Sequence, residues 1–403
     1  MPIINVDITW SKNGHNEISL KNGQIIIENG EIWLKGQMSS SEWRVFSRAY
    51  PANIDLWTDF KNCIKLNNAI LDGERVKVNL DSSYVYHSYS IHYQKGYADL
   101  SFRLTDFSYS YKCGDEESFA ILDVPFMHLS NHIQGLNRYP EDIILTNGSY
   151  TYRLCNYDDD KTKLLGQVEN DDYMDALLVH MSFFFNLLPN VFIKSFNLEG
   201  VMYVCCHSHK FSFPNESLYH SELPYLTFGE CHDFDYFFKN SKWMELGNDK
   251  KNIMKNTIYT FARCKYCDDV TQFLLLYSIF DRLVGNKSYN SKSMNTYNRM
   301  GNNLLNYNID IARIGDKIDK NLQKLQLKLE RNNGKEVVVD NFCMLRHYIL
   351  HFMSNAVVDE FISRCNLIDN MRFAVTIIIL KDLGFNNIKF RKEWDYLSVL
   401  IET

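Results

Sequence analysis

The stretch EISLKNGQIIIENGEIWLKG, from Glu17 to Gly36, decides the fold of the first part of the chain. It contains two Asn-Gly pairs, and each pair lies between short runs that are rich in β-branched residues. Asn-Gly readily adopts the positive φ angles that a tight hairpin turn requires. We therefore expect the chain to open with an antiparallel meander.

The same character continues well beyond this stretch. The segments RVKVNL (75–80), SYVYHSYSIHY (83–93) and DLSFRLTDFSYSY (99–111) alternate with period two and are rich in Tyr and Phe, as strands buried on one face are. A third Asn-Gly pair, Asn147-Gly148, separates two further strand-like runs. The charge cluster NYDDDKTK (156–163) then interrupts the pattern. Residues 1–160 are therefore predicted to form a β-rich, sandwich-like N-terminal domain.

The period changes after this boundary. The stretch DDYMDALLVHMSFFFNLLP (171–189) predicts a buried helix with an acidic N-terminus, and a hairpin that turns at Glu199-Gly200 follows it. These elements and a Cys/His cluster make residues 161–233 a connecting region. Residues 234–403 read as helices, among them IARIGDKIDKNLQKLQLKLE (311–330), whose apolar stripe has helical spacing. The predicted fold class is α+β, a β-rich domain followed by an α-helical bundle.

Composition narrows the class of protein. The chain has 403 residues and a formal net charge of −6, which argues against a broadly basic nucleic-acid-binding surface. The start MPIINVDITW lacks the pattern of a secretory signal, and the longest apolar run, FAVTIIIL from Phe373, is shorter than the roughly 20 residues of a membrane span. Ten cysteines without an export signal favour reduced thiols. We expect a cytoplasmic protein with no membrane partner.

One predicted helix, NFCMLRHYILHFM (341–353), carries an arginine and two histidines among apolar residues. At about 100° per residue, Leu345, Tyr348, Ile349, Phe352 and Ala356 share a core-facing side. The opposite side holds Arg346, His347, Leu350 and His351. His347 and His351 stand one turn apart on that side. A leucine among these polar groups favours a face that a second copy of the chain covers.

The segment RHYILH (346–351) resembles the R-x4-H signature of HEPN-domain ribonucleases, in which a polar residue often follows the arginine. Arg346, His347 and His351 occupy the three positions. The β-rich front, the helical bundle and LLLYSIFDRLVGN (274–286) resemble, more narrowly, the ApeA-type abortive-infection proteins of bacteria. That segment commonly carries an acidic residue, often Glu, where this chain has Asp281. The HEPN resemblance covers about residues 170–403.

This resemblance implies a metal-independent endoribonuclease whose composite site forms across a homodimer, or within a higher homo-oligomer. The 2′-OH of RNA is the nucleophile, so the enzyme supplies proton transfer and positive charge. Histidine transfers protons near neutral pH, and arginine offers a planar fork of donors to phosphate. We expect His351 as acid/base, Arg346 on the scissile phosphate, His347 in support of proton transfer and Asp281 as a supporting residue.

In biological terms, the resemblance implies anti-phage defence by abortive infection through cleavage of host RNA, for example tRNA. The N-terminal domain would then be the sensor or autoinhibitory module, with a phage protein as a candidate trigger. Two alternatives remain open. The chain could be a non-catalytic dimeric binding or sensor protein whose β domain captures a ligand or a protein. It could also be a metal-dependent hydrolase built on the Cys/His cluster.

That cluster comprises CCHSH (205–209), CH (231–232) and CKYC (264–267). Cys206 and His209 have knuckle spacing, as do Cys264 and Cys267. Together these four residues would make a closed Cys3His site of the kind that structural zinc favours. Four protein ligands leave no open position for a substrate, so a zinc ion here would be structural. For catalysis we expect no cofactor, because two copies of the R-x4-H motif supply both proton transfers without metal. The alternative is a set of free thiols in strands and helix ends.

Overall fold

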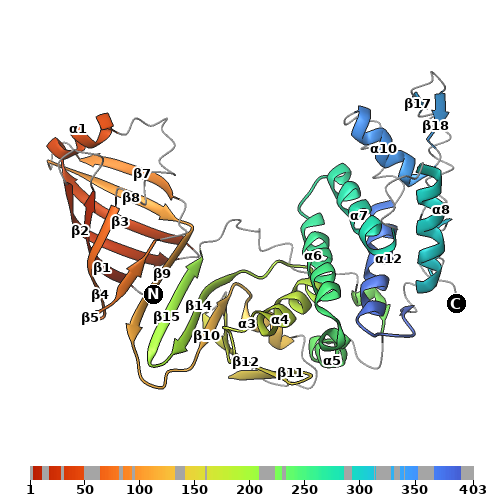
Figure 1. Cartoon of the computed structure of the whole chain (residues 1–403), viewed down its shortest axis with the longest axis horizontal. Helices are drawn as coiled ribbons and strands as arrows, with labels where there is room; N and C mark the ends of the chain where they lie inside the picture. Colours follow the sequence, from red (N-terminus) through yellow and green to blue (C-terminus); the bar gives the residue numbers. More distant parts are fainter. Residues whose placement is uncertain are drawn as a thin grey trace.

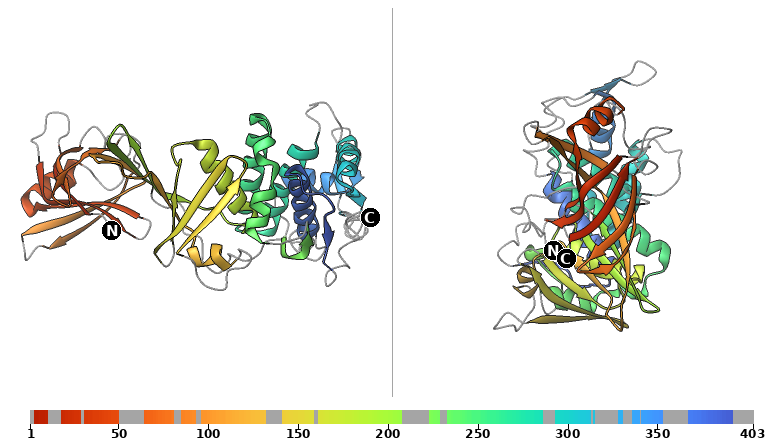
Figure 2. Two further views of the ribbon diagram at one scale, coloured as in Figure 1. Left: turned by 90° about the horizontal axis from the view of Figure 1, so that it is seen from below. Right: turned by 90° about the vertical axis from the view of Figure 1, so that its left-hand side faces the viewer.

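The computed structural model describes residues 3–10, 18–28, 31–49, 64–80, 85–92, 96–131, 141–158, 161–207, 223–228, 233–285, 293–312, 314, 328–330, 336–339, 341–352 and 367–391. The β-rich part and the helical part lie at opposite ends of an elongated molecule (Figures 1 and 2). Helices and antiparallel sheets are both extensive, with the strands concentrated in the first half. The predicted α+β class is confirmed.

The first sheet has seven strands in the order β5-β4-β1-β2-β3-β8-β7, and all neighbours are antiparallel. Its strands are β1 (Ile3–Trp10), β2 (Ile18–Glu28), β3 (Glu31–Ser39), β4 (Ile64–Leu71), β5 (Glu74–Arg75), β7 (Val85–His92) and β8 (Tyr97–Leu104). Helix α1 (Ser40–Ala49) follows β3. β8 shows strict alternation of buried and partly exposed residues, as its part of the segment 99–111 predicted.

The second sheet has eight strands in the order β11-β12-β13-β10-β14-β15-β9-β6. These strands are β6 (Lys77–Asn79), β9 (Asp106–Lys112), β10 (Phe119–Leu122), β11 (Asp142–Asn147), β12 (Tyr150–Asp158), β13 (Lys161–Leu165), β14 (Val191–Leu198) and β15 (Val201–His207). The short helix α3 (Phe126–Asn131) follows β10. The predicted turn at Glu199-Gly200 is confirmed: both residues have positive φ, and Leu198 pairs with Val201.

Opposite faces of this eight-stranded sheet belong to two different hydrophobic cores. On β10, Ile121 packs into the core that the seven-stranded sheet shares. Its neighbours Ala120 and Leu122 point to the other face and join the core of the helical part. Because successive side chains of a strand alternate between faces, one sheet supports both cores. Strands β10, β14 and β15 connect the two ends of the molecule (Figure 1).

The helical part packs on the β11–β10 end of that sheet. Its helices are α4 (Asp171–Phe184), α5 (Phe234–Asn240), α6 (Asn248–Cys264), α7 (Asp269–Val284), α8 (Ser293–Leu304), α10 (Phe342–Phe352) and α12 (Leu367–Asp382). Three short 3₁₀ turns, η3 (Leu223–Tyr225), η4 (Lys242–Glu245) and η5 (Leu305–Tyr307), connect them. Two small antiparallel pairs complete the described fold, β16 (Leu226–Thr227) with β19 (Lys389–Phe390) and β17 (Lys328–Glu330) with β18 (Glu336–Val338).

Three features differ from the sequence prediction. Asn22-Gly23 is not a turn: β2 runs through it, and a bulge lies there between Lys21 and Gln24. A Cβ on Gly23 would clash with the Val6 carbonyl oxygen, so this glycine allows close backbone approach rather than chain reversal.

The predicted boundary at about residue 160 falls inside a sheet. The charge cluster of residues 156–163 connects β12 to β13, and these strands pair directly. The eight-stranded sheet continues through β15, so the strands do not form a unit that ends at residue 160. The predicted helix 311–330 also differs, because Lys328–Glu330 form β17. Most of its remaining length, residues 315–327, lies outside the described residues, as does residue 160.

Candidate active site

Helix α10 carries the R-x4-H segment and is fixed at its start. The side-chain oxygen of Asn341, a buried residue, accepts a hydrogen bond from the Met344 backbone N–H at 3.0 Å. This is the helix-capping contact that Asn makes most readily. The Phe342 ring then packs against Tyr277 of α7 and Tyr297 of α8, with centroids 6.2 Å and 5.4 Å apart. The first turn of α10 is therefore anchored to two helices.

The two faces of α10 agree with the helical wheel. Leu345 and Ile349 are buried in the core of the helical part. Arg346 is half-buried, while His347 and Leu350 are exposed, Leu350 by 51%. His351 belongs to the helix, but its side chain lies outside the described residues. The prediction that Arg346, His347 and Leu350 share an outer side is confirmed.

Arg346 lies against a tyrosine that sequence reasoning missed. Its guanidinium carbon is 5.1 Å from the centroid of the Tyr277 ring. Tyr277 is buried in α7, far from Arg346 in sequence. Guanidinium groups are attracted to aromatic faces, and a buried ring is a rigid surface. This contact restricts where the charged end of Arg346 can lie.

Asp281 shares this neighbourhood. It follows Tyr277 by one helical turn on α7, so both residues point to the same side of that helix. Burial raises the pKa of Tyr277, to which Cys343 and Asp281 add, while Arg346 opposes them. Burial likewise raises the pKa of Cys343 to about 12, with Asp281 adding and Arg346 opposing. The structure thus brings Asp281 and Arg346 within electrostatic range of the same two groups.

The geometry leaves the Arg346 guanidinium available to an anion. Within the described residues, Arg346 makes no ion pair, and its guanidinium stacks on the Tyr277 ring. The Asp281 carboxylate is exposed on the neighbouring helix. Stacking on an aromatic face leaves the in-plane N–H donors of an arginine free. A phosphate could therefore bind Arg346 without displacing a protein carboxylate.

The predicted zinc ligands lie in different surroundings. Cys206 is buried on β15 in the core of the β-rich part, whereas Cys264 is buried in the helical core. The Cys264 and Cys267 thiols donate to the carbonyl oxygens of Thr260 and Arg263, at 3.2 Å and 3.7 Å. His209 lies outside the described residues. The described part of the chain contains no group of three His, Cys, Asp or Glu residues that could hold a metal ion. The zinc site stays a prediction.

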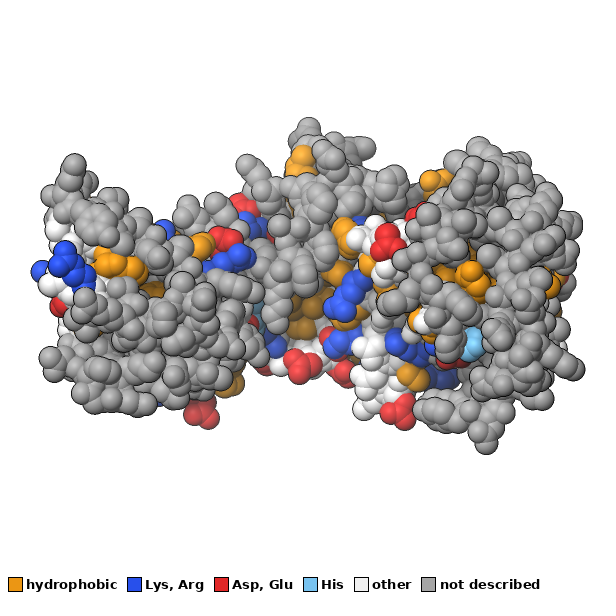
Figure 3. Space-filling model, turned by 90° about the horizontal axis from the view of Figure 1, so that it is seen from above, with side chains coloured by type: hydrophobic (Ala, Val, Ile, Leu, Met, Phe, Trp, Pro, Cys, Tyr) orange, Lys and Arg blue, Asp and Glu red, His pale blue; other side chains and the backbone are white. Residues whose placement is uncertain are grey.

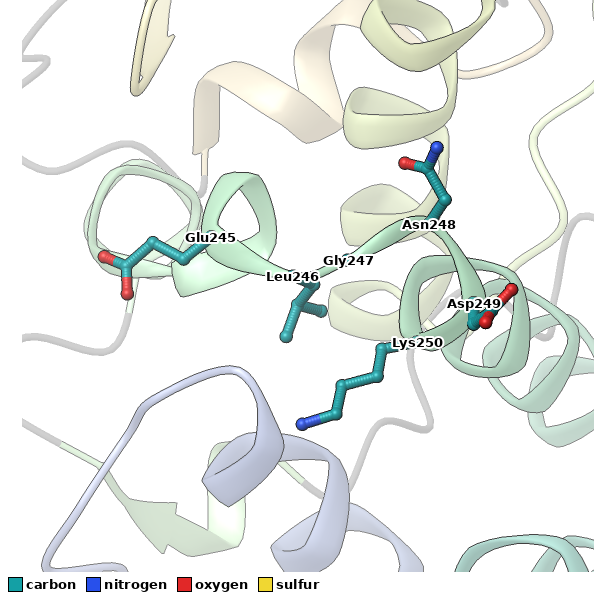
Figure 4. Close-up of a pocket in the computed structure, with 6 residues that line it drawn as sticks. All are labelled: Glu245, Leu246, Gly247, Asn248, Asp249 and Lys250. Carbon is teal, nitrogen blue, oxygen red and sulfur yellow. The ribbon is translucent and has the colours of Figure 1, made fainter.

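A surface pocket of about 420 Å³ lacks the converging side chains of a catalytic site. Six consecutive residues, 245–250, line it between η4 and α6. The side chains of Glu245, Asp249 and Lys250 point in different directions (Figure 4). A catalytic site needs groups that converge on one reacting atom, and this pocket does not provide them.

Among the described residues on the face that Figure 3 shows, basic side chains form no continuous coat. On the face that Figure 3 shows, Lys and Arg side chains lie in small groups with acidic side chains near them. This agrees with the negative net charge of the chain.

No family model, curated protein or solved structure matches the chain. Among the helices that the structure describes, none has both the length and the apolar character to cross a membrane.

Proposed function

We propose that the chain is a metal-independent endoribonuclease of the HEPN type. The observation that carries this proposal is the Arg346 guanidinium, which stacks on Tyr277 and makes no ion pair among the described residues, while Asp281 acts electrostatically on the same tyrosine. The expected acid/base residue, His351, follows Arg346 on the same helix. This is the combination of fixed positive charge and proton transfer that cleavage by a 2′-OH requires.

In the proposed reaction, the 2′-OH of the substrate attacks the adjacent phosphorus, and the bond to the 5′-oxygen breaks. One histidine accepts the proton of the 2′-OH, and a second protonates the departing 5′-oxygen. Arg346 stabilises the extra negative charge on the phosphorane. Two copies of α10 facing each other across a homodimer supply both histidines and two arginines. The exposed Leu350 beside Arg346 and His347 supports such a contact.

The biological proposal is host RNA cleavage in abortive infection, with the β-rich part as the sensor. It rests on the resemblance of the motif and of the order of the parts. The sheet shared by the two cores supports it as well, because it offers a continuous connection from the β-rich part to the helices. Ligand binding at one core could thereby act on the other.

The test is RNA cleavage in the presence of EDTA. We expect wild-type protein to cut RNA and to leave 2′,3′-cyclic phosphate ends. Arg346→Ala and His351→Ala should each lose at least about a hundredfold in rate, as the loss of a transition-state charge or of a general acid/base does. Undiminished cleavage in both variants would show that the site is assigned wrongly. Cleavage that EDTA abolishes would favour the metal-dependent alternative.

A further inference from the structure

One part of the eight-stranded sheet has a face with exposed side chains. At the β11–β10 end, that face carries α4, and Lys194 of β14 pairs with Asp171 of α4 at 3.4 Å. Beyond Lys194, towards β9 and β6, the same face is open among the described residues. Tyr203 and Leu198 on it are 40% and 51% exposed. The opposite face of the same strands is buried against the seven-stranded sheet.

Two aromatic side chains, a serine and a lysine lie in one row across this face. Phe196 pairs with Tyr203, Tyr203 with Ser110, and Ser110 with Lys77, on the neighbouring strands β14, β15, β9 and β6. Directly opposed residues of paired strands project to the same face. The Phe196 and Tyr203 rings stack, with centroids 5.6 Å apart and planes 13° apart. A stacked pair of one exposed tyrosine and one partly buried phenylalanine thus leads across the sheet to a lysine.

Positive charge gathers at the lysine end of the row. A shallow, open pocket of about 310 Å³ lies there, lined by Arg75, Val76, Lys77, Ser110, Tyr111, Lys112 and Val201. Arg75, Lys77 and Lys112 are exposed, and none of them makes an ion pair within the described part of the chain. Two carboxylates lie close to Tyr111 of the pocket wall: Glu116 accepts a hydrogen bond from its hydroxyl group at 3.1 Å, and both Glu116 and Glu74 help to raise the pKa of Tyr111.

We propose that this face is a binding platform for single-stranded RNA. A base stacks on Tyr203, and the phosphates that follow it contact Lys77, Lys112 and Arg75. Neighbouring strands are about 4.8 Å apart. Tyr203 on β15 and Lys77 on β6 are two strands apart, so their backbones are separated by about 10 Å. A base on Tyr203 and a phosphate that follows it can span this separation. Exposed aromatic rings beside a basic track are the arrangement by which sheets bind single strands without reading sequence.

The shape of the site favours a polymer over a free nucleotide. Small-molecule sites are concave and enclose most of their ligand, whereas this pocket is open and lies on a sheet surface. A strand gains affinity from several shallow contacts in a row, which a mononucleotide lacks. The platform lies outside the helical part and does not rest on the proposed ribonuclease activity.

The experiment measures fluorescence anisotropy of a labelled 2′-O-methyl RNA of about 10 nucleotides, within the usual site size of such a platform. This probe lacks the free 2′-OH, so the proposed reaction cannot consume it and the full-length wild-type chain can be used. Tyr203→Ala and Tyr203→Leu should each weaken binding about tenfold. Lys77→Ala should lower the slope of log affinity against log salt by about 0.7.

Two matched controls separate the platform from general effects. Tyr157→Ala removes a tyrosine of the same sheet with similar exposure, 43%. Lys65→Ala removes an exposed lysine of the seven-stranded sheet. Both should bind like wild type. Losses in the controls equal to those in Tyr203→Ala and Lys77→Ala would overturn the proposal. Competition by AMP as effective as that by the oligonucleotide would also overturn it, because the site would then bind a small molecule.

Discussion

The guanidinium of Arg346 stacks on the ring of Tyr277, with 5.1 Å between the guanidinium carbon and the ring centroid. Tyr277 is 6% exposed and packs between Phe273 of its own helix and Phe342 of α10. The Phe273 and Phe342 rings thus restrict the position of the Tyr277 ring, and the Tyr277 ring restricts the position of the Arg346 guanidinium. Catalytic charge is most effective when it is already in place before the substrate binds.

We therefore predict that the ring of Tyr277, rather than its hydroxyl group, is required for RNA cleavage. Tyr277→Phe keeps the aromatic face under Arg346 and should retain most activity. Tyr277→Leu removes that face and should lower kcat/KM about tenfold, in line with about 0.5–2 kcal/mol for a cation–π contact. Steady-state cleavage of a short RNA by each variant is the measurement.

Phe261→Leu is the matched control for lost packing. Phe261 is 1% exposed in α6, and its ring contacts Phe183 and Arg372 rather than Tyr277. Its replacement should lower the melting temperature to a similar degree without the same loss of kcat/KM. Equal activity losses in Tyr277→Leu and Phe261→Leu would mean that Tyr277 acts only through helix packing.

The sequence predicted the outer side of α10 but not its partner. A helix advances by about 100° per residue, so the common side of Arg346, His347 and Leu350 follows from their spacing alone. The contact with Tyr277 depends on how α7 and α10 cross, and local periodicity contains no such information. Asp281 was predicted through the resemblance. Tyr277 lies one turn before Asp281 on α7, and this spacing is the sequence signal that points to it.

The architecture was predictable in its parts and less so in their connection. The Asn-Gly pair at Asn147-Gly148 and the Glu199-Gly200 turn between two apolar runs correctly predicted the two hairpins there. The sharing of one sheet by two cores was not predictable. It arises from non-local pairs such as Cys206 with Phe107, and a charged hairpin connection near residue 160 resembles a linker when only composition is considered.

A second prediction concerns acid stability. His180 of α4 is buried among the rings of Phe237, Phe238 and Trp243, with centroids 5.3, 4.9 and 5.9 Å away. Burial lowers its pKa to about 4, and its hydrogen bond to the Ala176 carbonyl opposes this effect without outweighing it. Its Nε2 has no hydrogen-bond partner among the described residues. The folded protein therefore holds this imidazole neutral.

The sign of the effect follows from linkage. The unfolded chain binds a proton at His180 near its ordinary pKa of about 6.5, whereas the folded chain binds it only near 4. The stability that the neutral, buried His180 side chain contributes is fully present above about pH 6.5 and is lost as the pH falls towards 4. Between pH 7 and pH 5 the loss should be about 2 kcal/mol. Urea denaturation at the two pH values measures it.

His180→Leu should flatten this dependence. The variant loses the titrating group but keeps an apolar side chain in the aromatic surroundings. Its free energy of unfolding should change less between pH 7 and pH 5 than that of the wild type, by about the same 2 kcal/mol. An identical pH dependence in both proteins would show that other groups cause the acid sensitivity.

A third prediction tests the metal site. If Cys206, His209, Cys264 and Cys267 bind structural zinc, purified protein contains about one zinc ion per chain, and Cys267→Ser loses it. Cys267 is partly exposed, whereas Cys264 is buried, and the Cys267 thiol makes only a long hydrogen bond, 3.7 Å, to the Arg263 carbonyl oxygen. Replacing Cys267 should therefore cost little stability apart from the loss of the metal. Elemental analysis of wild type decides the matter. A content well below one ion per chain would exclude a structural zinc.

The final prediction concerns the second copy of the chain. Leu350 is 51% exposed between the polar groups of the outer side of α10, where a two-fold contact would bury it against its own copy. Leu350→Glu places like charges opposite each other in that contact and should convert a dimer into a monomer. RNA cleavage should fall with it, because the monomer has one arginine and one histidine pair instead of two. Light scattering and cleavage assays on the same samples test both consequences.

Leu305→Glu is the matched control, because Leu305 in η5 is 50% exposed and lies away from α10 in sequence. It should leave both the mass and the activity unchanged. Mixing supplies a stricter test: Arg346→Ala and Leu350→Glu chains, each inactive alone, should not restore cleavage together if α10 must pair with an intact α10. Full activity in monomeric Leu350→Glu would refute the composite site, because one chain would then supply both proton-transfer groups without its partner.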